Sequence, residues 1–271
     1  MADSTIEFNP IRITIAVLAL ALIALLVVTH ETPADYTELL YEQRPADAES
    51  VLLVGNSHAR TAYVPQMLQR IAHDDERHPP LWIDIRAPGG WTLGQHVANE
   101  TVERNMADGN TDYVVLQGQS LEPLFQADIY LRSFEHLAIT AQDLGAEPIL
   151  FQTWPRHPDC ESYRELSSPP SDPYQVHAQK TRLATEAIAQ TSARHAPVAQ
   201  AWEAIRTSDA PLDLYAPDGN HANHRGAYLT ALVLYGTIID DGLPDEPWHP
   251  PELSSSEVGR LLETANEALN Q

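Results

Sequence analysis

A serine, an aspartate and a histidine in two distant stretches of this sequence are of the types that carry out acyl transfer. Ser57 lies in VLLVGNSHAR, residues 51–60, and Asp218 and His221 stand three apart in LYAPDGNHANHRGAYL, residues 214–229. A serine nucleophile needs a base within hydrogen-bond reach, and that base needs an acceptor that orients it. One short turn that carries both Asp218 and His221 could provide the base and its acceptor for Ser57.

Each of these residues also has an ordinary structural interpretation. Serine is a common N-cap, so Ser57 could simply begin a helix. Asp218 could close an Asx turn, and His221 could lie on the surface or cap an element. The three-residue spacing of His221 and His224 would allow a metal site. Neither a cysteine nor a set of carboxylates accompanies the pair, however, and we predict no metal.

Three groups could stabilise the negative oxygen that develops in acyl transfer. The N–H of Ser57 should be free at a helix N-terminus, where the helix dipole favours negative charge. The stretch APGGWTLGQH, residues 87–96, has paired glycines that let the backbone approach a ligand closely. The stretch LQGQS, residues 116–120, offers the side-chain amides of Gln117 and Gln119.

Apolar runs at intervals along the chain predict the elements that position these residues. The runs cover residues 51–55, 81–85, 113–117 and 147–154, with a weaker fifth at 196–201. Amphipathic helical segments lie between them, and further helices are expected at 226–240 and 255–269. This alternation indicates an α/β fold with a parallel sheet covered on both faces. Sites in such sheets form beyond the carboxyl ends of the strands, so the residues that follow the runs should meet.

In these stretches the sequence resembles the SGNH hydrolases, the superfamily of GDSL-like lipases and esterases. GNSH, residues 55–58, resembles the family's serine block, GGWT, residues 89–92, its glycine block, and DGNH, residues 218–221, its D-x-x-H block. The third block departs from the pattern, because Gly118, Gln119 and Ser120 stand where the family has G-x-N. The resemblance covers residues 50–240 and implies a three-layer, flavodoxin-like sandwich around a central parallel sheet of five strands.

The resemblance also implies roles for individual residues. Ser57 would be the nucleophile, His221 the base and Asp218 its orienting partner, and the oxyanion hole would comprise Ser57, Gly90 and Gln119. The implied activity is hydrolysis of carboxylic esters without a metal or organic cofactor, on a small ester or on an acylated carbohydrate such as an O-acetylated glycan. Two alternatives stay open: an O-acyltransferase acting on surface glycans, and a non-catalytic surface binding module.

Two features could shape the substrate site. The polar, proline-rich stretch 155–173 follows the fourth apolar run and is long enough to form a lid or specificity loop. A disordered surface excursion is the alternative. Trp91 and Trp154 lie at predicted strand ends, where they could stack on a sugar ring or belong to the core.

The first 29 residues predict a transmembrane anchor or a signal segment. Residues 13–28, ITIAVLALALIALLVV, carry no charge and approach the roughly 17–25 residues of a membrane span. The preceding MADSTIEFNPIR is not basic and no small-x-small cleavage site follows, so we favour an uncleaved anchor over a secreted, cleaved form. Arg12 precedes the span and no Lys or Arg follows it until Arg44, which predicts an extracytoplasmic domain. Residues 30–49 would be a linker and residues 50–271 the hydrolase domain.

The composition excludes some classes of function. Asp and Glu number 38 against 16 Lys and Arg, for a formal net charge of −22. Such an acidic chain is a poor candidate for nucleic-acid binding, which depends on neutralising phosphates. An acidic surface with a single lysine would suit a protein kept soluble in high salt, and an ordinary acidic protein is the alternative. Cys160 is the only cysteine, so no internal disulfide can form.

Overall fold

A computed structural model describes residues 36–108, 110–160, 163 and 172–271 of the chain. The predicted span 13–28 and most of the predicted lid, 161–162 and 164–171, lie outside these residues. Within the described ranges, no helix is long and apolar enough to cross a membrane. The compact unit begins at Tyr36, which is 5% exposed and packs against Tyr63 and Trp248. Part of the predicted linker, residues 36–48, therefore belongs to the domain.

A parallel five-stranded sheet forms the centre of the fold, as predicted. Its strands are β1 (Glu49–Val54), β2 (Leu81–Arg86), β3 (Tyr113–Gln117), β4 (Glu147–Phe151) and β5 (Arg194–Ala196). They are arranged in the order β2-β1-β3-β4-β5, and every neighbouring pair is parallel. All five carboxyl ends consequently lie at one edge of the sheet, and β1 and β3 are adjacent there.

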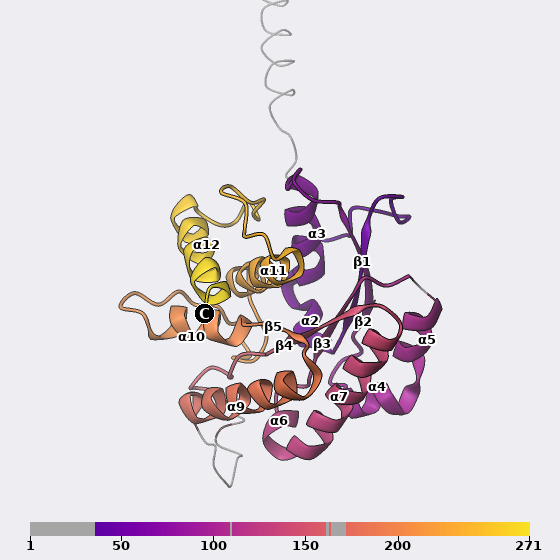
Figure 1. Ribbon diagram of the computed structural model, residues 1–271. Coiled ribbons are helices and arrows are strands. Elements are labelled where there is room, and N and C mark those ends of the chain that lie inside the picture. Colours follow the sequence, from indigo (N-terminus) through magenta and orange to yellow (C-terminus); the bar gives the residue numbers. More distant parts are fainter. Residues whose placement is uncertain (1–35, 109, 161–162, 164–171) are drawn as a thin grey trace, which may run out of the picture. The chain divides into compact units, whose positions relative to one another are not determined.

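Helices cover both faces of the sheet (Figure 1). One face is covered by α3 (Val64–Asp74), α10 (Val198–Thr207), α11 (His224–Ile239) and α12 (Ser255–Leu269). The other is covered by α4 (Leu93–Asn99), α5 (Thr101–Asp108), α6 (Glu122–Phe125), α7 (Ala127–Asp143) and α9 (Pro173–Thr191). The short helix α2 (Ser57–Arg60) and the 3-10 turn η1 (Thr61–Tyr63) connect β1 to α3.

Alternation along β1 creates two hydrophobic cores. Val51 and Leu53 face the layer of α3 and α11, whereas Leu52 and Val54 face the layer of α4 and α7. A strand buried on both faces must be apolar at every position, which is why VLLV reads as one continuous run.

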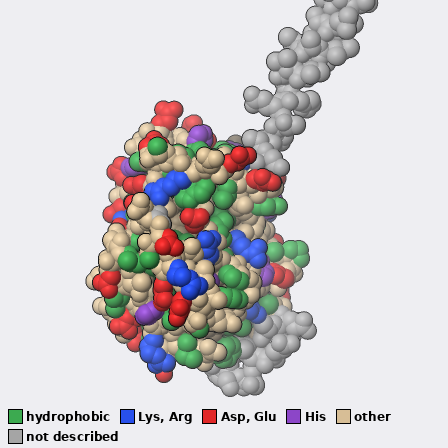
Figure 2. Space-filling view, turned by 90° about the vertical axis from the view of Figure 1, so that its right-hand side faces the viewer, with side chains coloured by type: hydrophobic (Ala, Val, Ile, Leu, Met, Phe, Trp, Pro, Cys, Tyr) green, Lys and Arg blue, Asp and Glu red, His purple; other side chains and the backbone are tan. Residues whose placement is uncertain are grey.

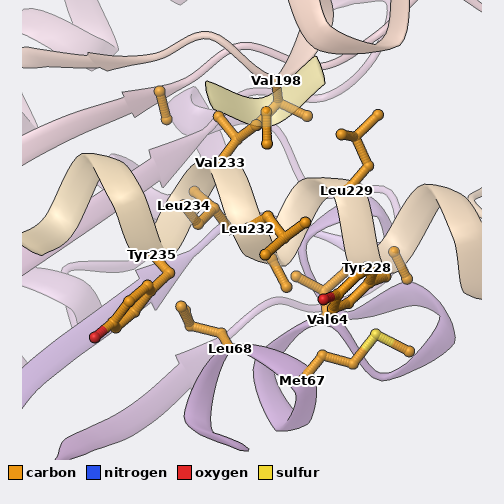
Figure 3. Packing of buried hydrophobic residues seen from close by; sticks show 14 of the residues in the cluster. Val64, Met67, Leu68, Val198, Tyr228, Leu229, Leu232, Val233, Leu234 and Tyr235 are labelled. Atoms are coloured by element: carbon orange, nitrogen blue, oxygen red, sulfur yellow. The ribbon is translucent and has the colours of Figure 1, made fainter. Parts of the chain in front are cut away.

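Helix α11 is the central element of the first layer. Its residues from Gly226 to Ile238 are all buried, in agreement with the apolar character of the predicted helix. Figure 3 shows Tyr228, Leu232 and Tyr235 of α11 packed beside Val64, Met67 and Leu68 of α3. This packing fixes the N-terminal end of α11 next to the residues that follow Ser57.

The predicted fifth strand, 196–201, is wrong in position. The structure has β5 at Arg194–Ala196 and a helix, α10, from Val198. Pro197 separates them, and the buried residues Val198, Trp202 and Ile205 then recur at helical spacing. A proline next to a short edge strand explains the early end of the pairing.

Charged side chains are distributed over the surface. On the face that Figure 2 presents, acidic and basic groups are interspersed among polar and small apolar ones, without a large area of one sign. The acidic excess is thus dispersed there, and this face offers no basic patch of the kind that binds nucleic acid.

Candidate active site

The turn after β1 presents Ser57 at the carboxyl edge of the sheet. Asn56 is the N-cap of α2, and its Oδ1 accepts a hydrogen bond from the His58 N–H at 3.1 Å. A Cβ at Gly55 would stand 2.5 Å from Oε1 of Gln117, so any other residue there would displace this buried amide. The sharp turn and the helix start together leave the Ser57 hydroxyl partly exposed above the sheet.

The structure places Ser57, His221 and Asp218 in one hydrogen-bonded chain. The Ser57 hydroxyl lies 2.8 Å from Nε2 of His221, and Nδ1 of His221 lies 2.6 Å from Oδ2 of Asp218. The loop that carries them turns at Gly219, whose φ is +65°. Oδ1 of Asp218 accepts the N–H groups of Asn220 and His221, so a single carboxylate shapes the loop and orients the ring.

Asp218 stays ionised at any ordinary pH. Burial alone would raise the pKa of this carboxyl, but hydrogen bonds from the His221 ring and from two backbone N–H groups hold it at about 2. An ionised Asp218 keeps the proton of the neutral His221 ring on Nδ1, which leaves Nε2 free to accept the Ser57 proton.

The glycine block forms a turn that exposes backbone next to Ser57. Trp91 N–H donates to the Pro88 carbonyl across this turn, and Gly90 adopts a φ of +75°. The turn's own hydrogen bond uses the Trp91 N–H rather than that of Gly90. Thr92 then caps α4 in a capping box with Gln95. A glycine at position 90 is needed because other residues rarely adopt that backbone conformation.

The Gln119 amide is oriented by α6. Its Oε1 accepts the N–H groups of Leu121 and Glu122 at 2.6 and 3.0 Å, so it caps the start of this helix. The Nε2 end of the same amide consequently turns away from α6. If Gln119 donates to an oxyanion, it must do so through this Nε2.

Three polar residues that the sequence did not single out for these roles connect the blocks. Asn56 donates from Nδ2 to the Trp91 carbonyl at 2.9 Å, which ties the serine block to the glycine block. Gln117 is fully buried and accepts the Asn56 N–H at 3.0 Å. Glu122 is 3% exposed, and its Oε2 accepts from the N–H groups of Leu93 and Gln119. Gln117 therefore supports the turn rather than an oxyanion.

His58 and Trp154 pack against the loop that carries Asp218 and His221, which we call the histidine loop. The ring centroids of His58 and His221 are 4.9 Å apart, and Nε2 of His58 donates to Oδ1 of Asn220. Burial, and then the neighbouring cationic groups, lower the pKa of His58 to about 3, which keeps its ring neutral. Trp154 donates to the Asn220 carbonyl and stacks on Trp202 with centroids 3.9 Å apart. Because Trp154 is fully buried, it belongs to the core and cannot stack on a sugar, whereas Trp91 remains partly exposed.

The two histidines of the D-x-x-H region point to different partners. His221 faces Asp218, whereas Nδ1 of His224 is bonded to the Tyr36 hydroxyl at 2.7 Å. Among the residues with described positions, no group of three side chains could hold a metal ion. Cys160 lies beside the loop, with its Sγ 3.6 Å from the Asp218 carbonyl oxygen.

Comparison with known proteins identifies structural relatives. No protein-family model and no curated protein matches the chain. A candidate SGNH hydrolase from Slackia heliotrinireducens is 28% identical, with a match over 70% of this chain and 99% of its own and a TM-score of 0.62. A DUF4886 family protein from Bacteroides uniformis is 19% identical over 83% and 95%, with a TM-score of 0.69. An acetylxylan esterase from Geobacillus stearothermophilus is 13% identical over 71% and 93%, with a TM-score of 0.52.

Proposed function

Because the chain has the fold of the SGNH hydrolase superfamily, we propose that it is a serine esterase in which Ser57 attacks the carbonyl of a carboxylic ester. The SGNH-type assignment made from sequence is confirmed at the level of the fold, and ester hydrolysis is the reaction class of its esterase neighbours. The single observation that carries the residue assignment is the chain of short contacts from Ser57 through His221 to Asp218.

The proposed mechanism uses each contact of that chain. His221 takes the Ser57 proton at Nε2 and later returns it to the leaving alcohol, while Asp218 stabilises the imidazolium. The N–H groups of Ser57 and Gly90 and the Nε2 of Gln119 donate to the oxyanion. Each such donor is typically worth about 3–4 kcal/mol of the barrier. A water activated by His221 then hydrolyses the acyl-enzyme.

The proposed substrates are small carboxylic esters, including O-acetyl groups on carbohydrates. The likeness in fold to an acetylxylan esterase supports this class. The uncharged run 13–28 supports attachment to a membrane, with the domain on the extracytoplasmic side.

The test is hydrolysis of p-nitrophenyl acetate and butyrate by the full-length protein, in low and in high salt. We expect Ser57→Ala and His221→Ala each to lower kcat by at least about 10³-fold, because removing any member of such a triad leaves only a small residue of catalysis. Equal activity of the parent and Ser57→Ala would exclude Ser57 as nucleophile. Addition of an alcohol acceptor separates hydrolysis from acyl transfer, which would divert the acyl group to the acceptor.

A further inference from the structure

We propose that Arg156 forms a carboxylate-binding subsite next to Ser120, at the end of β3 that leads to the proposed oxyanion-hole residue Gln119, and that the enzyme prefers esters carrying a negative charge near the ester bond. This inference rests on the proposed esterase function and names the chemical class of its substrate. The charge could lie on the acyl part, as in a half-ester of a dicarboxylic acid, or on the alcohol part, as in an acidic sugar.

The backbone on both sides of Arg156 is hydrogen-bonded to the histidine loop. The Pro155 carbonyl accepts the Tyr215 hydroxyl at 2.9 Å, and the His157 N–H donates to the Gly219 carbonyl at 2.7 Å. Gly219 lies between Asp218 and His221 in sequence. The backbone on either side of Arg156 is therefore tied to the loop that carries His221.

The Arg156 side chain extends toward the end of β3. Its Nη2 is 3.4 Å from the Ser120 hydroxyl, which is a long hydrogen bond, and Ser120 directly follows Gln119 of the proposed oxyanion hole. Its Nε is buried and without a hydrogen-bond partner. Arg156 also makes no ion pair with a carboxylate of the described residues. A guanidinium that has no carboxylate partner among the described residues and whose Nη2 makes only a long bond to a hydroxyl can bind a carboxylate that arrives with the substrate.

A buried lysine near Arg156 also has no carboxylate partner among the described residues. Lys180, the only lysine, is 3% exposed and donates to neutral acceptors, namely Oγ1 of Thr153 at 3.0 Å and the Trp154 carbonyl at 2.9 Å. Burial, and then the positive charge of Arg156, lower the pKa of Lys180 to about 7. The positive charge of Arg156 therefore disfavours the charged form of Lys180, and Arg156 is the permanent cation of the two.

The field of this pair reaches the catalytic residues. The positive charges of Lys180 and Arg156 both act on His58, whose ring lies against that of His221. In a chain with a net charge of −22, most of the surface repels an anionic substrate. The Arg156 guanidinium next to Ser120 offsets this repulsion locally, at the carboxyl edge of the sheet where the ester has to bind.

The test compares matched charged and neutral esters. On the acyl side, 4-nitrophenyl hydrogen glutarate is compared with 4-nitrophenyl butyrate, and on the alcohol side 4-acetoxybenzoate with its methyl ester. We expect the charged member of one pair to have the higher kcat/KM by about tenfold or more, since a charge-assisted hydrogen bond contributes about 10- to 100-fold. The pair that responds identifies the side of the ester that carries the carboxylate.

Three variants assign the preference to Arg156. Arg156→Gln should lower the charged-to-neutral ratio of kcat/KM about tenfold or more. Arg156→Lys, which keeps the charge but not the forked geometry, should retain part of the preference for the charged ester. Arg182→Gln is the matched control, because Arg182 lies on the exposed side of α9 in an ion pair with Glu186 and should leave the ratio unchanged.

Two results would overturn the inference while the esterase function stands. One is Ser57-dependent hydrolysis in which neither charged ester is preferred. The other is a preference that Arg156→Gln, shown to be folded by circular dichroism, leaves unchanged. If no ester is hydrolysed, the esterase function fails, and calorimetric binding of the charged esters to Ser57→Ala decides the subsite. Binding that is lost on adding Arg156→Gln supports the subsite, and no binding of either charged ester excludes it.

Discussion

Asn56 offers a sharp test of how the active site is held together. Its amide uses both ends, since Oδ1 accepts the His58 N–H and Nδ2 donates to the Trp91 carbonyl at 2.9 Å. The SGNH family, which the sequence resembles, frequently has an aspartate at this position. Asn56→Asp would nevertheless place a carboxylate oxygen against the Trp91 carbonyl in a site that is only 1% exposed. We therefore predict that the family's usual residue destabilises this protein.

The size of the loss follows from these contacts. An uncompensated buried charge typically costs about 3–5 kcal/mol, and the retained bond from the His58 N–H favours the lower end, about 3 kcal/mol near pH 8. At 1.36 kcal/mol for each pKa unit, this raises the pKa of the introduced carboxyl in the folded variant from about 3.9 to about 6. Because the pKa of the introduced carboxyl would be higher in the folded than in the unfolded variant, the variant keeps its stability below a pH of about 3.9 and loses it as the pH rises through about 6.

Urea unfolding of the parent and of Asn56→Asp at pH 5 and pH 8 measures this difference directly. We expect a destabilisation of about 3 kcal/mol at pH 8, of which roughly half is recovered at pH 5, where the new carboxyl is protonated and can donate to the Trp91 carbonyl. The matched control is Asn105→Asp, because Oδ1 of Asn105 only accepts a bond from Arg86 at 2.6 Å and a carboxylate can do the same. Equal stability of Asn56→Asp and the parent at pH 8, or a loss that does not change with pH, would refute the reasoning.

Three further substitutions test other contacts of the site. Asp218→Asn should lower kcat by about 10³- to 10⁴-fold, because an amide stabilises the imidazolium of His221 poorly; a loss below tenfold in steady-state assays would contradict the assigned role. Trp154→Phe removes the indole N–H from the Asn220 carbonyl and also part of a fully buried ring, so it should cost about 2–4 kcal/mol of stability by urea unfolding. We expect a several-fold fall in kcat/KM as the histidine loop loosens, and an unchanged kcat/KM would show that this bond does not position the loop. Burial raises the pKa of the Glu122 carboxyl, so the stability that the protonated Glu122 contributes is lost as the pH rises through its folded-state pKa. The stability advantage of the parent over Glu122→Gln should therefore shrink from pH 4 to pH 8. An advantage that grows over this range in urea unfolding would argue against the raised pKa.

The sequence predicts much of this fold because the signals involved are local. β1 and β3 read as continuous apolar runs because each is buried on both faces, and the parallel arrangement then places the residues after them at one edge. The three-residue spacing of Asp218 and His221 puts both on one turn, where the structure has them in contact. Local patterns of this kind can be recognised in a sequence without knowledge of tertiary packing.

The remaining features depend on contacts between residues far apart in the chain. Nothing around Gln117 indicates that its amide supports the N–H of Asn56, and nothing around Trp154 indicates that it stacks on Trp202. The misplaced fifth strand has another cause, because APVAQA is apolar enough for either element and Pro197 decides between them. Sequence patterns predict which residues are buried more readily than which side chains then meet.

The attachment of residues 154–157 to the histidine loop limits how substrate choice in this enzyme can be engineered. Trp154, Pro155 and His157 each hydrogen-bond to the loop that carries His221, and the proposed selectivity residue Arg156 lies between them. The proposed selectivity residue and the proposed catalytic histidine thus share one piece of backbone and do not form exchangeable modules. A chimaera that imports the β4–α9 connection of another hydrolase should place its first junction after His157. A junction before Trp154 would replace the support of His221, the proposed catalytic base, together with the proposed selectivity residue.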